Sequence, residues 1–482
     1  MLGKRFDMAR HRAVIGVWLG IGWLMPIASG FDYRRTLLTV ALCLAGASAA
    51  VAARKPINGV AGILLVAVFF LGAVSSAASP LPAWSALDTG YTLLLVVAAT
   101  CALAPGLDAL SPRPERLIAM AAFAPIALAC IAAVVVIAAS LLSGFGLRYP
   151  EPMGNYGNIR FFDQYQTWLL PFLPAAFALS CPLPRARRVF WWALVSVIAV
   201  FFWALYWRSD GRGTGYATAL ATLLVLLFCG HTGRRHAVAM AIFALGGYVV
   251  YGFMFANGAS HAQHLLSASS DGRLYLWRIA LDQILRHPLL GIGPMMFADI
   301  DTGLAAHPHN AILQFAAEWG VPATILIVAG IAWLLYRWLR FARRASRGGE
   351  HSRRWLVVAL TASLFAGCIH ALVSGVIVMP ASQFMGATVC GLAFALYGAS
   401  SRHQAIGALG LPSPTGRAVF ALVILTAAAY TALFSYWHGP HRGAPGIKTN
   451  SVYLRNANEP RFWADGTLIG RRPRLPPDTI EQ

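Results

Sequence analysis

Long uncharged runs of apolar residues recur along the whole chain, separated by short polar connections. The run at 119–142, AMAAFAPIALACIAAVVVIAASLL, is one of them. An uncharged apolar stretch of about 18 or more residues is typical of a helix that crosses a bilayer. The pattern therefore predicts an all-α fold, a polytopic transmembrane helical bundle with about 12–13 spans.

The predicted spans fill residues 1–435. They lie at residues 13–29, 36–53, 58–77, 88–105, 117–142, 167–181, 189–207, 214–229, 238–256, 310–337, 355–379, 382–399 and 418–435. Residues 436–482 form a polar, proline-rich C-terminal tail, in which RFWADGTLIG resembles a small hairpin.

Composition and charge agree with a membrane protein. Of the 482 residues 58% are hydrophobic and 12% are charged, whereas soluble domains carry roughly 25% charged residues. The net charge is +20, and the basic residues gather in alternate connections, as expected on a cytoplasmic face and against anionic lipid headgroups. No nucleic-acid-binding motif accompanies them, so nucleic acid is not an expected partner.

Two longer connections fall on the other, outer side, at residues 143–166 and 257–309. The second loop holds an apolar pattern typical of a short amphipathic helix lying on the membrane surface. Its members are Leu274, Trp277, Ile279, Ala280 and Ile284. Loops of this length are usually functional. The same alternation puts the basic tail outside, against the charge rule.

Polar side chains cluster at three places on this outer side. Arg160 and Gln164 precede the sixth span, Arg208 and Arg212 lie between the seventh and eighth, and Arg273, Arg278, His307 and His309 belong to the long loop. Arginine presents a planar fork of donors that suits phosphate oxygens. The convergence predicts a polyanion site; lipid headgroup binding and helix capping are the alternatives.

His309 and Asn310 stand just before the predicted span 310–337. A neutral imidazole at the water–lipid boundary can accept a proton from a hydroxyl, although a hydrated interfacial histidine would look the same. Asn310 can bind a sugar or cap the helix. His370, inside an apolar run, is expected to be a satisfied core histidine.

No metal or cofactor site is predicted. Asp299-x-Asp301 has the DxD form of metal-dependent glycosyltransferases, but without companion ligands it indicates a turn. Gly291-x-Gly293 lacks a surrounding βαβ unit, and the seven cysteines form no metal-binding pattern.

Three segments together resemble the O-antigen ligase and O-antigen polymerase superfamily, which is related to bacterial protein O-oligosaccharyltransferases. HNAILQFAAEWGVPA is similar to its H[NSQ]-x9-G pattern, from His309 to Gly320. SDGRGTGYATALATLL resembles its Ser-Arg-Gly segment around Arg212, and GRLYLWRIALDQILRHPLLGIGP its arginine, tryptophan and hPllGiG segment. The resemblance is strongest over 190–340; Ala323 departs from the Gly, Thr or Tyr often found there.

The resemblance implies a multi-pass protein of the bacterial inner membrane with a periplasmic active site. A glycan would pass from an undecaprenyl diphosphate carrier to an acceptor hydroxyl on lipid A–core, another glycan or a protein, without metal. Arg212 and Arg273 would stabilise the diphosphate, and His309 would deprotonate or orient the hydroxyl. The remaining candidates, as substrate-binding residues, are Arg160, Gln164, Arg208, Arg278, His307 and Asn310.

Ligation of O-antigen to lipid A–core is the favoured activity. O-antigen polymerisation and pilin O-glycosylation remain alternatives. A flippase or transporter for polyprenyl-linked glycans is the alternative of a different class, but it would be expected to carry ionisable residues deep in broken helices.

Overall fold

The computed structural model describes residues 2–52, 60–104, 114–144, 147, 151–177, 183–255, 262–300, 302, 304–401, 414–438 and 462. Within these ranges every regular element is a helix. The elements are α1 (Leu2–Leu24), α2 (Gly30–Ala52), α3 (Val60–Ala78), α4 (Pro82–Val97), η1 (Ala98–Leu103), α6 (Pro114–Leu142), η2 (Gly154–Tyr156), α7 (Ile159–Leu169), η3 (Leu170–Phe172), α8 (Leu173–Ala176), α9 (Arg185–Ser209), α10 (Arg212–Phe228), α11 (Gly230–Phe255), α12 (Ala262–Arg286), η5 (Met296–Asp299), α13 (Ala311–Trp319), α14 (Val321–Ala345), α15 (His351–Ala371), α16 (Pro380–Ser401) and α17 (Pro414–His438).

Nine of the described helices are long and apolar enough to cross a membrane, and Ala13–Leu24 and Arg212–Phe228 are shorter apolar segments. Many large apolar side chains face outward, among them Leu142 at 90% and Phe253 at 87% exposure. Such a surface is costly in water but is solvated by lipid. The prediction of an all-α, polytopic membrane protein is confirmed.

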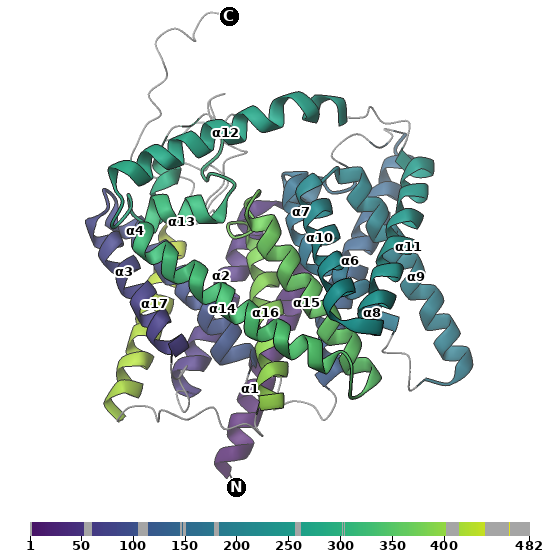
Figure 1. The fold of residues 1–482 in the computed structure, drawn as a ribbon, viewed down its shortest axis with the longest axis horizontal. Coiled ribbons are helices and arrows are strands. Elements are labelled where there is room, and N and C mark those ends of the chain that lie inside the picture. The colour runs from purple at the N-terminus through teal and green to yellow at the C-terminus, as the bar shows by residue number, and fades with distance from the viewer. Residues whose placement is uncertain are drawn as a thin grey trace, which may run out of the picture.

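One helix differs from the bundle in direction. α12 lies across one end of the bundle, and the N-terminus emerges at the opposite end (Figure 1). α12 is therefore longer than the short surface helix that the sequence predicts, since it has 25 residues. Leu276 and Ala280 of α12 are buried against the molecule, whereas Leu274, one of the predicted apolar contacts, is 48% exposed.

Two predicted spans have different boundaries. The span predicted at 310–337 is broken at Gly320 into α13 and α14, so His309 heads a short separate helix and not the membrane span itself. The span predicted at 167–181 is not one long helix: α7 begins earlier, capped by Asn158, which accepts a hydrogen bond from the Arg160 amide at 3.0 Å, and the short helices η3 and α8 follow it. None of these three is among the described helices that are long and apolar enough to cross a membrane. Arg160 and Gln164 therefore lie on a helix instead of a loop.

Two buried arginines at the start of α2 bind backbone carbonyls of segments that are distant in sequence. Arg34 Nη1 donates to the Asn155 carbonyl oxygen at 3.0 Å, and its guanidinium stacks 3.7 Å above the Tyr156 ring. Arg35 donates to the Val378 carbonyl oxygen at 2.6 Å. The carbonyls and aromatic faces compensate for the burial of both charges.

Candidate cationic site

The segment that follows α12 is fixed to the junction between α13 and α14. The backbone hydrogen bonds run from Ile292 N to Ala317 O at 2.8 Å, from Gly293 N to Glu318 O at 3.0 Å and from Val321 N to Pro288 O at 2.9 Å. Gly320 has φ +85° and lies so close to the Leu289 carbonyl oxygen that a Cβ there would overlap it. Only glycine satisfies both conditions.

His307, His309 and Asn310 form a tight turn before α13. The His309 amide donates to His307 Nδ1 at 3.2 Å, and the two ring centroids are 4.2 Å apart. His309 has φ +55°, which is uncommon for a residue with a side chain and recurs at functional sites. Asn310 Oδ1 accepts from the Leu313 amide at 3.1 Å, which confirms the helix cap; Trp277 of α12 holds the turn by donating to the Pro308 carbonyl at 3.0 Å.

Arg212 is the first residue of α10, directly after the turn that ends α9. Asp210 closes α9 in the left-handed conformation, and the Arg212 amide donates to the Asp210 carbonyl oxygen at 3.0 Å. The backbone of Gly211 lies against the Asp163 carboxylate of α7, where a Cβ would overlap the carboxylate. The turn therefore fixes the backbone position of Arg212.

Three arginines and a histidine from different elements lie close enough to influence one another's charge. Burial lowers the pKa of Arg273, and the positive charges of Arg160 and Arg212 lower it further. Burial also lowers the pKa of His309 to about 3, with additional contributions from Arg273 and Arg160. The structure thus gathers four predicted residues into one cationic site, in which the imidazole is neutral.

Asp163 is a carboxylate of this region, and Asp210 lies within electrostatic range of it. Asp163 is buried and accepts a hydrogen bond from the Ser209 hydroxyl. Burial raises the pKa of Asp163 to about 7, and the Ser209 hydrogen bond and the Arg160 charge oppose that shift. The site therefore holds a group that titrates near neutral pH as well as fixed positive charges.

Three other predicted substrate-binding residues, Gln164, Arg208 and Arg278, do not belong to this group of mutually interacting charges. Gln164, a predicted substrate-binding residue, is buried at 2% exposure; its Nε2 donates to Ser374 Oγ at 2.9 Å, and its Oε1 has no partner within the described chain. Arg208 is also buried, donates to the Glu151 carbonyl oxygen at 3.2 Å and stacks over Phe255. Arg278 is exposed, because five residues turn a helix by about 140° away from Arg273.

Sequence reasoning missed the position of His370. It is buried and hydrogen-bonded, as expected of a core histidine, with Nδ1 2.7 Å from Thr167 Oγ1. However, it also lies within electrostatic range of Arg273 and His309. Nothing in an apolar run reveals this proximity, which depends on the packing of α15 against α7 and α10.

The DxD motif lies only partly within the described residues. Asp299 ends the short helix η5, in line with the expected turn, and Asp301 lies outside the described residues. No group of three His, Cys, Asp or Glu side chains that could hold a metal occurs among the residues that the structure describes. The predicted hairpin at RFWADGTLIG also falls outside them, except for Phe462, which packs 5.0 Å from the ring of Tyr91.

These features define a multi-pass helical membrane protein with a cationic site at the end of its bundle beside α12. Residues 166–328 match the family model described as O-antigen ligase. This match confirms the predicted resemblance to the O-antigen ligase and polymerase superfamily over these residues, and the matched family suggests glycosyltransferase activity of that type. The matched segment contains Arg212, Arg273 and His309 but neither Arg160 nor His370. The comparison with curated proteins gives no match.

Proposed function

We propose that the protein transfers a glycan from undecaprenyl diphosphate to an acceptor hydroxyl at the periplasmic face, and that the reaction is ligation of O-antigen to lipid A–core. The observation that carries the proposal is that Arg160 and Arg212 lie within electrostatic range of Arg273, while Arg273 and Arg160 lie within electrostatic range of the neutral imidazole of His309. Neighbouring cations of this kind repel one another unless an anion lies between them.

The arginines would act on the leaving group. As the acceptor oxygen attacks the anomeric carbon, the bond to the diphosphate breaks and negative charge grows on its oxygens. Arg212 and Arg273 would stabilise this charge from fixed positions, and the partly enclosed site strengthens the effect. The sugar–phosphate bond supplies the driving force, so this scheme needs neither metal nor another cofactor.

His309 would receive or orient the proton of the acceptor hydroxyl. In the free site its ring is neutral because burial and two arginine charges keep its pKa near 3. A bound diphosphate would offset those charges and raise the pKa, which makes the imidazole a better base once the donor is present. Gln164 Oε1, which is buried and without a partner in the described chain, would accept a hydrogen bond from a sugar hydroxyl.

The lipopolysaccharide gel pattern of a deletion strain tests this proposal. Loss of the whole O-antigen ladder with an intact core band is the expected result, with recovery when the intact gene is returned. A core band carrying one repeat unit would instead indicate a polymerase. An unchanged ladder with a lighter pilin would indicate protein glycosylation, and an unchanged ladder with unchanged pilin would contradict the proposal.

A further inference from the structure

A buried hydroxyl network lies directly behind the start of α10. Thr167 Oγ1 of α7 is 2.9 Å from Thr214 Oγ1 of α10, and both hydroxyls lie within hydrogen-bond distance of the Asp163 carbonyl oxygen, at 3.1 and 2.8 Å. Thr167 and Thr214 are completely buried. Thr214 follows Arg212 by two residues, so the network fixes the helical turn that carries this arginine.

His370 of α15 closes the network from the other side. Its Nδ1 is 2.7 Å from Thr167 Oγ1. Its opposite ring nitrogen, Nε2, faces Gly213, where an added Cβ would lie 2.5 Å away. The imidazole therefore fills the space between α7 and the residue next to Arg212.

We propose that His370 is a positioning residue that holds Arg212 in the orientation required to bind the diphosphate. The inference rests on the proposed function. A bidentate contact between a guanidinium and a phosphate tolerates little displacement, and residues that lock the supporting backbone control it. His370 contacts Gly213, the residue next to Arg212, and would act through Arg212.

A purely space-filling role predicts a different result from a hydrogen-bonding role. His370→Leu fills much of the volume but cannot bond to Thr167, whereas His370→Asn places an amide nitrogen near the position of Nδ1. We expect His370→Asn to keep much of the affinity for the diphosphate and His370→Leu to keep little of it. Equal affinities of the two variants would overturn the proposal.

The decisive experiment is a double-mutant cycle on the full chain in lipid nanodiscs, with undecaprenyl diphosphate as the probe. His370→Leu should raise the dissociation constant by about tenfold when Arg212 is present, and by less than about twofold in Arg212→Ala. Equal effects in both backgrounds would show that His370 does not act through Arg212.

Two further comparisons keep the outcome interpretable. If His370→Leu fails to fold, Thr214→Val removes a hydroxyl of the same network and should show the same dependence on Arg212; equal effects of Thr214→Val in both backgrounds would overturn the proposal. If Arg212→Ala and Arg273→Ala bind the probe as tightly as the unaltered protein, it is the proposed function that fails, together with the inference that rests on it.

Discussion

At the scale of single residues, Arg160 and Arg273 supply positive charge to the candidate site and also lower the basicity of His309. Burial lowers the pKa of His309, and the charges of Arg273 and Arg160 lower it further, so the free site holds a neutral imidazole beside fixed cations. The anionic donor of the proposed reaction would offset these positive charges. Under the proposed function, binding of the donor would therefore be coupled to proton acceptance by His309.

Substitution of the arginines tests whether planar recognition of phosphate matters. Arg212→Ala and Arg273→Ala should each lower kcat/KM about 10²–10³-fold, and lysine should restore only part of the loss because it lacks the fork of donors. The measurement is transfer from a polyprenyl diphosphate glycan by the purified protein. Full recovery with lysine would contradict bidentate binding.

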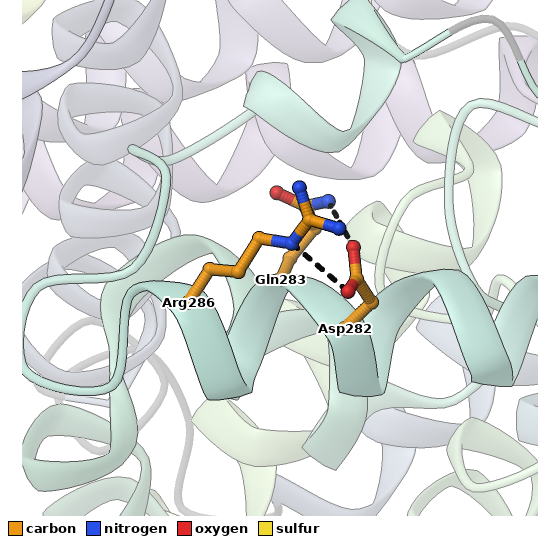
Figure 2. Close-up of polar contacts among 3 residues, drawn as sticks. All are labelled: Asp282, Gln283 and Arg286. Atoms are coloured by element: carbon orange, nitrogen blue, oxygen red, sulfur yellow. Dashed lines mark hydrogen bonds and ion pairs between the residues drawn. The ribbon is translucent and has the colours of Figure 1, made fainter.

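A matched control lies on the same helix as Arg273. Arg286 pairs with Asp282 at 2.9 Å on the exposed surface of α12, beside Gln283 (Figure 2). The side chains of Arg286 and Asp282 are 67% and 46% exposed, and a pair of this kind contributes about 0–1 kcal/mol. Arg286→Ala should therefore leave transfer unchanged.

The pH dependence of kcat/KM tests the state of His309. Because burial and the arginines lower its pKa to about 3, the ring stays neutral as the pH falls through the ordinary value of about 6.5. The profile should be measured in Asp163→Asn, since burial raises the pKa of Asp163 to about 7. We expect no acid limb attributable to His309 between about pH 5 and 8; a limb near 6.5 that His309→Gln removes would contradict the assignment.

At the scale of elements, the junction at Gly320 joins the site to the membrane bundle. Gly320→Ala would place a Cβ against the Leu289 carbonyl oxygen at a positive φ, which costs about 1–3 kcal/mol of local strain. Transfer should fall while membrane insertion is kept. Gly330→Ala within α14 is the control, because its Cβ would meet nothing nearer than Leu64 at 4.0 Å.

The sequence predicts the apolar helices better than it predicts the points at which one helix ends and the next begins. Apolar length is enough to predict the bundle, and three motif segments together are enough to predict the family resemblance over residues 166–328; the roles of the site residues stay predictions. Periodicity did not reveal the break at Gly320, since a glycine inside an apolar run is compatible with a continuous helix. The burial of Gln164 and the approach of His370 to Arg273 depend on contacts between helices far apart in sequence, which one sequence does not encode locally.

At the scale of the whole molecule, the account requires the site and the N-terminus to lie on opposite sides of the membrane. α12 and the N-terminus occupy opposite ends of the bundle (Figure 1), and the basic connections predict a cytoplasmic N-terminus. In a cysteine-free background, cysteines at 212 and 309 should react with an impermeant thiol reagent added from the periplasm, and a cysteine at position 4 should not. Labelling of 212 and 309 from opposite sides would refute the shared site.

The central claim is metal-independent transfer that depends on His309, and reconstituted transfer measures it most directly. Purified protein with an undecaprenyl diphosphate glycan and lipid A–core, in the presence of EDTA, should form the ligated product. His309→Ala should lower the rate about 10²–10⁴-fold, and His351→Ala, at the start of α15, should not. A requirement for added divalent ion, or normal transfer by His309→Ala, would contradict the account.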